Sequence, residues 1–236
     1  MVDDDSGPVY RECGYNVIYP QAVREAIESV PQGEDLVLEV NSGGGSAFSG
    51  FEIYSILRGA KCRTVAEVQS LAGSAASTIA CGCDEVIMSP VAQMMIHDPA
   101  LVTVGNIREH RESLQALKSI KEGILNGYLG KCRGKTSRDE LDKLMSRETW
   151  LSAQDCVRLG LADSILAEDG TDPGAIYNAA QAGFWACVNS CALPPIEELL
   201  ALKRRHECEN SDHAGGEPAD MAWQSRAKLM IEQNRY

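Results

Sequence analysis

The sequence predicts an α/β fold, because apolar strand-like runs alternate with helical patterns along the chain. Residues 36–40 form a short apolar run that leads directly into a glycine-rich turn, and a helical pattern follows. The same order recurs at residues 65–68, which precede a helix of small residues. Strands that are separated by helices need crossover connections, so parallel pairing is favoured. A 3.6-residue periodicity from Val104 to Leu129 also predicts one long helix that projects or packs between subunits.

The first half of the chain contains most of the predicted sheet. The expected elements are, in order, a helix from Pro20 to Val30, a strand at 36–40, a helix through Phe48 and Leu57, a strand at 65–68, a small-residue helix at 74–81, and short strands at 85–88 and 94–97. Pro20 suits the first turn of a helix, where its missing N–H is not needed. Gly82 is expected to end the small-residue helix.

The second half is predicted to be mainly helical. After the long helix, Ser137 and Glu140 have the spacing of a capping box for a helix that ends near Met145. Another helix is expected at 152–159, and a strand at 162–166 follows it. These closing elements complete a compact domain, which we place at residues 1–166.

Residues 167–236 are expected to form a C-terminal extension that is partly disordered. An acidic, turn-rich segment at 168–174 separates it from the domain, and residues 206–219 are polar with few apolar side chains. A short helix is expected near 195–205, either as a docking segment or as a surface helix without a partner.

Charge and hydropathy exclude two classes of partner. A formal net charge of -12 opposes general nucleic-acid binding, because such a surface repels a polyanion. No apolar stretch approaches the ~20 residues that a membrane-spanning helix needs. We therefore expect a soluble protein with no nucleic-acid partner and no membrane partner.

The nine cysteines are scattered at irregular intervals, with no signal peptide before them. We interpret them as structural thiols in a reducing cytoplasm. The pairs Cys81/Cys83 and Cys187/Cys191 lack the CxxC spacing of a zinc site. We expect neither a metal site nor an organic cofactor.

Two residues have the placement of a serine nucleophile and its base. Ser74 follows a strand-like run at the start of a helix, and His97 ends an apolar strand just before Pro99. A serine hydroxyl needs a positioned base to take its proton, and the oxyanion intermediate needs backbone N–H donors. In the alternative interpretation, Ser74 is an N-cap and His97 is structural. Ser77 lies one turn later and is expected to point into helix packing.

Four segments occur in the order and at the separations found in the Clp protease proteolytic subunit (ClpP) family. They are Asn-Ser-Gly-Gly-Gly at 41–45, Ala-Gly-Ser-Ala-Ala-Ser at 72–77, Met-Ile-His-Asp-Pro at 95–99, and Glu-Thr-Trp-Leu-Ser-Ala at 148–153. The chain resembles this family over roughly residues 17–166, and most resembles its prophage branch, which serves phage head maturation. The resemblance implies the ClpP/crotonase-like fold of repeated β-β-α and β-α units, with residues 104–129 as a projecting handle helix.

The resemblance also implies roles for individual residues. Ser74 corresponds to the nucleophile, the N–H of Ala75 to one oxyanion donor, and His97 to the general base. The family's usual aspartate falls on Glu148, which is one methylene longer but still able to orient an imidazole. In the alternative interpretation, Glu148 is a surface carboxylate paired with Arg147.

The glycine run is similar to the family's Ser-Pro-Gly-Gly segment, with Gly43 in place of the proline. By resemblance, Gly44 and Gly45 provide an oxyanion N–H and a backbone edge for the substrate. Asp98 is adjacent to His97, but neighbouring strand residues point to opposite faces, so it is a poor substitute for Glu148. Residues 1–19 are shorter than the family's opening strand and axial loop, so we do not expect an unfoldase to bind by that route.

The implied activity is hydrolysis of peptide bonds in polypeptide substrates, through an acyl-enzyme on Ser74. The resemblance further implies homo-oligomeric rings, heptamers or double heptamers, with an AAA+ unfoldase or phage capsid proteins as further partners. Three alternatives stay open: a catalytically inactive ring scaffold, a signal-peptide-peptidase-like enzyme with a serine–lysine dyad, and a crotonase-type acyl enzyme. The presence of His97 argues against the second, and the Ser74–His97 pair argues against the third.

Overall fold

The computed structural model describes residues 1–166, 195–201 and 204. These residues divide into two compact units. The larger unit contains Met1 and residues 19–166, and the smaller one contains residues 2–18, 195–201 and 204. The predicted character of the C-terminal extension lies largely outside the described residues.

The larger unit alternates strands and helices, as the sequence predicts. Its elements are α2 (Pro20–Ser29), β1 (Leu36–Ser42), α3 (Ala47–Arg58), β2 (Thr64–Gly73), α4 (Ala75–Gly82), β3 (Glu85–Met88), β4 (Gln93–Ile96), α5 (Ile107–Cys132), α6 (Arg138–Ser146), β5 (Thr149–Ser152), α7 (Ala153–Leu159) and β6 (Ser164–Ile165). The strands form one six-stranded sheet in the order β5-β4-β2-β3-β6, and β1 also pairs with β2. All pairs are parallel except β4 with β5, so the predicted α/β class is confirmed.

Strand β2 is the centre of this sheet and is longer than the predicted strand at 65–68. It pairs with β1, then with β3 through Val68, and with β4 from Leu71 onward. Gln69 and Ser70 are exposed at the point where β2 changes neighbours, which explains why the apolar pattern breaks there. The extension brings the C-terminal end of β2 beside β4.

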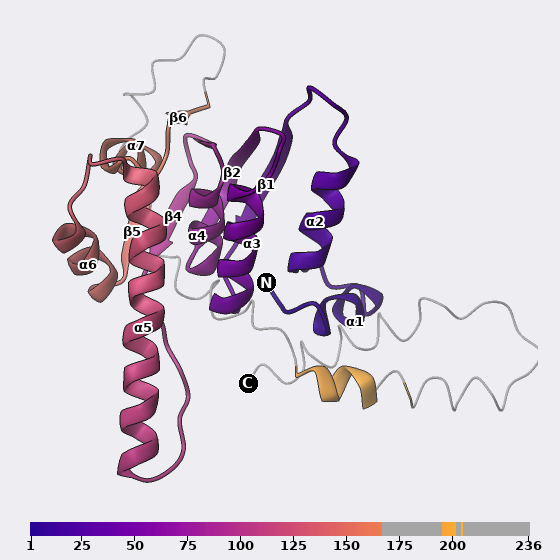
Figure 1. The fold of residues 1–236 in the computed structure, drawn as a ribbon, viewed down its shortest axis with the longest axis vertical. Coiled ribbons are helices and arrows are strands. Elements are labelled where there is room, and N and C mark those ends of the chain that lie inside the picture. The colour runs from indigo at the N-terminus through magenta and orange to yellow at the C-terminus, as the bar shows by residue number, and fades with distance from the viewer. Residues whose placement is uncertain (167–194, 202–203, 205–236) are drawn as a thin grey trace, which may run out of the picture. The chain divides into compact units, whose positions relative to one another are not determined.

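Helices α3 and α4 lie together on one face of the sheet (Figure 1). They approach closely because Gly50 faces Ala75: a side-chain carbon at position 50 would lie 3.2 Å from the Ala75 Cβ. All eight residues of α4 are buried, so its small side chains fill a confined space between α3 and the sheet. The start of α4 is therefore held firmly at the end of β2.

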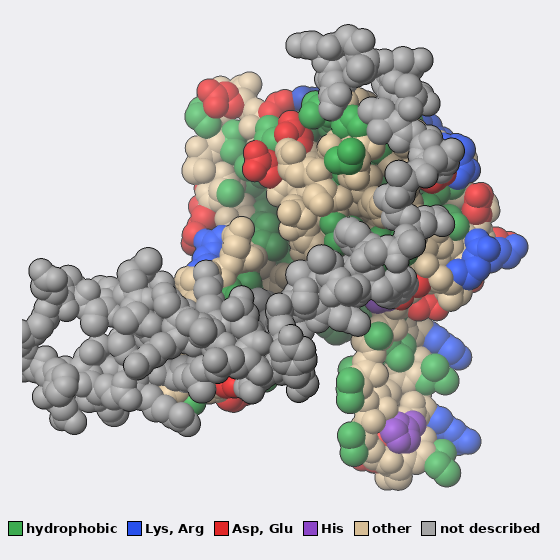
Figure 2. All heavy atoms as spheres, turned by 180° about the vertical axis from the view of Figure 1, so that it is seen from behind, with side chains coloured by type: hydrophobic (Ala, Val, Ile, Leu, Met, Phe, Trp, Pro, Cys, Tyr) green, Lys and Arg blue, Asp and Glu red, His purple; other side chains and the backbone are tan. Residues whose placement is uncertain are grey.

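Helix α5 is the predicted long helix, displaced by a few residues. It begins at Ile107 because Asn106 caps it, in a capping box with Glu109. Its buried residues all lie in the C-terminal third, while the N-terminal part extends beyond the sheet (Figure 1). Hydrophobic side chains gather on the projecting part (Figure 2). The exposed large apolar residues here are Ile107 and Leu114 of α5, together with Leu101, Val102 and Val104 in the loop that precedes it.

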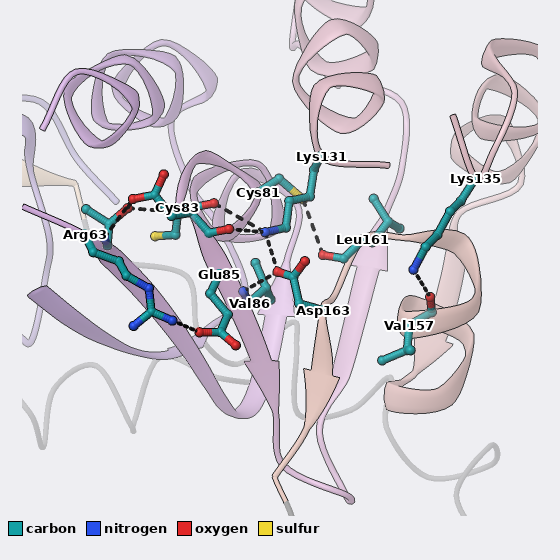
Figure 3. A network of polar contacts seen from close by, with 12 residues as sticks. Arg63, Cys81, Cys83, Glu85, Val86, Lys131, Lys135, Val157, Leu161 and Asp163 are labelled. Carbon is teal, nitrogen blue, oxygen red and sulfur yellow. Dashed lines mark hydrogen bonds and ion pairs between the residues drawn. The ribbon is translucent and has the colours of Figure 1, made fainter. Parts of the chain in front are cut away.

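The buried end of α5 is fixed to the sheet by Lys131 (Figure 3). Its ammonium group contacts the Asp163 carboxylate at 2.5 Å and the carbonyl oxygens of Cys83 at 3.4 Å and Asp84 at 3.1 Å. Asp163 also accepts a hydrogen bond from the Val86 N–H at 2.8 Å. The side chain of Lys131 is only 3% exposed, so these contacts replace the water that its charge has lost.

The described cysteines pack as thiols rather than as disulfides. Cys13, Cys62, Cys81, Cys83, Cys132 and Cys156 are all free. Burial raises the pKa of the Cys83 thiol to about 12 and that of Cys132 to about 11, so both stay protonated near neutral pH.

The smaller unit contains a helix that the sequence does not predict, α1 (Ser6–Glu12). Tyr10 and Tyr15 pack edge to face there, with ring centres 6.1 Å apart. Residues 196–201 and 204 are helical, within the predicted range 195–205, and Leu199 is buried. Across the described helices, none is long and apolar enough to cross a membrane.

Candidate active site

Ser74 occupies a sharp turn between β2 and α4. Its backbone has a φ of 51° and a ψ of -124°, in a region that non-glycine residues rarely adopt. Such a conformation costs on the order of 1–3 kcal/mol and persists only where the surroundings enforce it. The N–H of Ser74 donates to the Met95 carbonyl at 2.8 Å, which holds the turn against β4. This strand–turn–helix geometry presents a serine hydroxyl at the edge of a sheet.

His97 follows β4 and lies beside Ser74. Because Gly73 pairs with Met95 in parallel strands, the residues that follow β2 and β4 emerge at the same edge of the sheet. The Nε2 of His97 is 2.8 Å from the Ser74 Oγ. If Ser74 donates this hydrogen bond, the ring proton of neutral His97 resides on Nδ1. The structure thus brings together the two residues that the sequence singles out.

Glu148 directly precedes β5, as His97 directly follows β4. The antiparallel register of these strands ends with Thr149 opposite Ile96, so Glu148 and His97 are the next residues of the two strands. Its φ of 49° makes it another positive-φ residue at this edge. Within residues 1–166, no hydrogen bond joins its carboxylate to His97.

Asp98 is engaged elsewhere. Its carboxylate contacts the Lys121 ammonium group at 2.9 Å and accepts a hydrogen bond from the Ser146 hydroxyl at 3.3 Å. These partners belong to α5 and to the end of α6. The geometry therefore gives Asp98 a structural ion pair.

The glycine loop, residues 43–45, packs directly against the serine turn, which is the turn at Ser74 between β2 and α4. Gly44 has a φ of 118°, and a side-chain carbon there would lie 2.7 Å from the Ser74 Cβ. Only glycine fits this position without displacing Ser74. The Gly44 N–H donates to the Ser42 hydroxyl at 3.2 Å. The N–H of Ala75 is in the first turn of α4 and therefore has no intrahelical acceptor.

Met1 lies along the outer edge of the glycine loop, a contact that the sequence gives no signal for. Its amino group donates to the Gly44 carbonyl at 2.9 Å, and its carbonyl accepts from the Ser46 N–H at 3.2 Å. A side chain at Gly45 would collide with the Met1 backbone. Burial lowers the pKa of the Met1 amino group.

A largely apolar cavity of about 270 Å³ opens beside Ser74 and His97. It is lined by Gly45, Ser46, Ala47, Phe51, Ser74, Ala75, Thr78, His97, Pro99, Ala100, Ile120, Ile124 and Tyr128. The α5 periodicity marks Ile120 and Ile124 as one apolar face, but the sequence alone does not reveal that this face completes a site. A cavity of this kind can hold an apolar side chain next to the serine hydroxyl.

Together these groups can perform acyl transfer. A hydroxyl in contact with an imidazole, backbone N–H groups nearby and an adjacent cavity are the parts that covalent catalysis at a carbonyl requires. Among the described residues, no cluster of three or more His, Cys, Asp or Glu side chains is arranged to hold a metal ion.

Comparison with known proteins points to one family. The Clp protease family profile matches residues 17–169, which is more than half of the chain. The ATP-dependent Clp protease proteolytic subunit 1 of Chlamydia muridarum is 27% identical over 144 residues, covering 59% of this chain and 74% of that protein. The ATP-dependent Clp protease proteolytic subunit of Porphyromonas gingivalis is 26% identical over 160 residues, covering 65% of this chain and 68% of that protein.

Proposed function

Because this chain belongs to the Clp protease family, and so is a homologue of peptidases, we propose that it is a serine endopeptidase with Ser74 as nucleophile and His97 as general base. The observation that carries the proposal is the 2.8 Å contact between the Ser74 Oγ and the His97 Nε2. A strained turn that points a half-buried hydroxyl at an imidazole is typical of a functional site.

In the proposed reaction, the Ser74 oxygen attacks the carbonyl carbon of a peptide bond while His97 takes the hydroxyl proton. The negative oxygen of the tetrahedral intermediate accepts hydrogen bonds from the Ala75 N–H and from the glycine loop, either at Gly45 or at Gly44, whose N–H must then leave the Ser42 hydroxyl. His97 then gives its proton to the departing amine, which leaves an acyl-enzyme on Ser74. Water, deprotonated by His97, hydrolyses the ester.

Glu148 is the proposed third member of the triad. The support is that β4 pairs Ile96 with Thr149, so that His97 and Glu148 are the next residues of the two paired strands; a carboxylate there would accept the Nδ1 proton and stabilise the cation. This role requires the Glu148 side chain to turn toward the ring, because the contact is absent in this conformation.

The proposed substrate is an unfolded or extended polypeptide. An extended backbone can pair with the glycine loop, as in other cases of strand addition, while one apolar side chain enters the cavity. A peptide on this edge displaces Met1, which now holds the Gly44 carbonyl and the Ser46 N–H. The prophage-branch resemblance extends the proposed substrates to phage capsid and scaffold proteins.

We further propose that the chain assembles into rings, with α5 at the contact between rings. The support is the hydrophobic side chains on the projecting segment (Figure 2), together with the loop before α5, where Val102 and Val104 are 91% and 92% exposed. A cluster of such apolar residues is typical of a surface that is covered in an assembly. An AAA+ unfoldase is the proposed partner that would deliver folded substrates to such a chamber.

Hydrolysis of a fluorogenic peptide and of an unfolded protein such as casein tests the proposed function. We expect Ser74→Ala and His97→Ala each to lower kcat by at least about 10³-fold, since the two residues act as one unit. Ser55→Ala is the matched control for the serine change, because Ser55 is exposed on α3 and does not line the cavity beside Ser74, so this variant should leave the rate unchanged.

Two results would contradict the proposal. Retention of activity in Ser74→Ala or His97→Ala would exclude this nucleophile and base. If the parent protein forms a ring and hydrolyses neither substrate, the inactive ring scaffold would be favoured instead. The missing contact between Glu148 and His97 is compatible with such a scaffold.

A further inference from the structure

The backbone carbonyl of Ser74 is held by a buried side-chain hydroxyl. Ser77, which is completely buried, donates its hydroxyl proton to the Ser74 carbonyl oxygen at 2.5 Å. The N–H groups of Ser77 and Thr78 point to the same oxygen, at 3.0 and 3.4 Å. The two N–H contacts are those of any helix start, whereas the hydroxyl contact depends on the side chain at position 77.

Tyr128 of α5 completes a line of hydrogen bonds. Its hydroxyl oxygen is 2.7 Å from the Ser77 Oγ, and the tyrosine is only 1% exposed. Ser77 has a single hydroxyl proton, and the Ser74 carbonyl already accepts it, so Tyr128 must be the donor to Ser77. Burial also raises the pKa of Tyr128, which keeps this donor protonated.

The Ser74 carbonyl and the Ala75 N–H belong to one planar peptide unit. Fixing the direction of the carbonyl therefore fixes the direction of the N–H on the opposite side of the same plane. That N–H is the oxyanion donor of the proposed mechanism, and the plane also sets the ψ angle of Ser74, which is strained at -124°. The Ser77 hydroxyl thus acts on both the nucleophile turn and the oxyanion donor without touching substrate.

Tyr128 is itself held in place by its own helix. Lys131, three residues later, binds Asp163 and the carbonyls of Cys83 and Asp84 at the buried end of α5 (Figure 3). At Gly127 the helix packs against α4, since a side-chain carbon there would be in ordinary van der Waals contact with Thr78, at 3.7 Å. Because the helix that carries Tyr128 is anchored in this way, the Tyr128 hydroxyl can fix the position of the serine turn.

We infer that Ser77 and Tyr128 are positioning residues, whose relay from Tyr128 through Ser77 to the Ser74 carbonyl orients the Ser74–Ala75 peptide plane for oxyanion binding. This inference rests on the proposed function. Ser77 is the cleaner probe of the two, because it does not line the cavity, whereas Tyr128 does.

The test measures kcat and KM for fluorogenic peptides with Ser77→Ala, Tyr128→Phe and the double variant. We expect each single variant to lower kcat by about 10-fold and to change KM by less than about twofold, because oxyanion donors act mainly in the transition state. The loss of kcat in the double variant should be no larger than in the more affected single variant, since both changes interrupt the same chain of hydrogen bonds. Ser77→Thr, which restores the hydroxyl, should recover most of the rate.

Thr136→Val is the matched control. Thr136 is also a buried hydroxyl that donates to a carbonyl, that of Leu159 at 2.7 Å, but it lies away from the site. Its removal should lower the melting temperature and leave kcat per folded molecule unchanged.

The outcomes separate this inference from the function on which it rests. An active parent whose Ser77→Ala and Tyr128→Phe variants behave like Thr136→Val would overturn the positioning role alone. Tyr128→Phe could instead lower kcat only for substrates with one type of apolar side chain, while Ser77→Ala keeps its kcat. This result would show an effect on the cavity and would also overturn the positioning role. A parent with no activity and no labelling of Ser74 would contradict the proposed function and this inference with it.

Discussion

The contacts of His97 with its two proposed triad partners differ, because the contact with Ser74 is formed and that with Glu148 is not. We call Ser74 and its turn the serine side, and Glu148 with the start of β5 the glutamate side. Ser74 follows β2 and Glu148 precedes β5, the two strands that pair with β4, and each has a positive φ near 50°. On the serine side, the Ser74 N–H donates to Met95, the Ser74 carbonyl accepts from the Ser77 hydroxyl, and the Ser74 Oγ contacts the His97 Nε2. On the glutamate side, the Glu148 N–H donates to the Met145 carbonyl, but the carboxylate does not contact the imidazole.

The difference follows from what holds each residue in place. Ser74 has a short side chain on a buried, hydrogen-bonded turn, so the register of β2 and β4 almost completely determines where its hydroxyl lies. Glu148 is half-buried and has three side-chain torsions, whose restriction costs on the order of 1–2 kcal/mol. Backbone register can bring a carboxylate opposite a histidine without closing the hydrogen bond. We therefore expect the serine side to dominate catalysis.

Among changes that keep both Ser74 and His97, the largest effect is expected from disturbing the serine side at Gly44. In Gly44→Ala, the new methyl group would lie 2.7 Å from the Ser74 Cβ and strain a φ of 118°. We predict a loss in kcat of about 100-fold or more, because small misplacements of reacting groups have effects of this size. Peptide hydrolysis and thermal melting measure the two consequences.

Gly33→Ala is the control for the strain alone. Gly33 has a φ of 90° with nothing within 4 Å of an added side-chain carbon. This variant should lower stability and leave kcat per folded molecule unchanged. Equal kcat losses in Gly33→Ala and Gly44→Ala would mean that the close contact at Ser74 is not what matters.

A smaller effect is expected on the glutamate side. Glu148→Gln should lower kcat by about 10- to 100-fold, less than the roughly 10⁴-fold seen when a preformed triad carboxylate is neutralised, because the contact must first form. Glu148→Asp keeps the charge and should retain more activity than Glu148→Gln. If Glu148→Gln is fully active, Glu148 is not the third member of the triad.

The smallest effect is expected at Asp98. Its carboxylate contacts Lys121 and Ser146 rather than His97, and the side chain is 43% exposed. Asp98→Asn should change kcat by less than about threefold and stability by about 1 kcal/mol at most, as is usual for exposed ion pairs. A kcat loss as large as that of Glu148→Gln would instead identify Asp98 as the group that orients the histidine.

The sequence predicts those parts of the fold and site that depend on neighbouring residues. The apolar run at 36–40, the small-residue helix that becomes α4, and the capping serine at 137 are local signals, and each corresponds to an element of the structure. Ser74 and His97 are found for the same reason, since each lies at the end of a recognisable strand. Their contact then follows once β2 and β4 are parallel.

The parts that escape prediction depend on contacts between distant residues. Strand β5 is only four residues long and is defined by pairing with β4, while β2 continues past the polar Gln69 and Ser70 because β4 pairs with its second half. The hydrogen bond from Tyr128 to Ser77 joins residues 51 positions apart, and neither residue type indicates such a contact in the sequence. Sequence reasoning places Ser77 in helix packing and misses its contact with the Ser74 carbonyl.

The most direct measurement is to react the intact protein with a fluorophosphonate probe and to locate the adduct by peptide mass spectrometry. In this reaction the Ser74 oxygen would form a bond to phosphorus, fluoride would leave, and His97 would take the hydroxyl proton. We predict a single adduct on Ser74 that is absent in His97→Ala and in Ser74→Ala. An adduct on another serine such as Ser77, or no adduct on the assembled protein, would contradict the account.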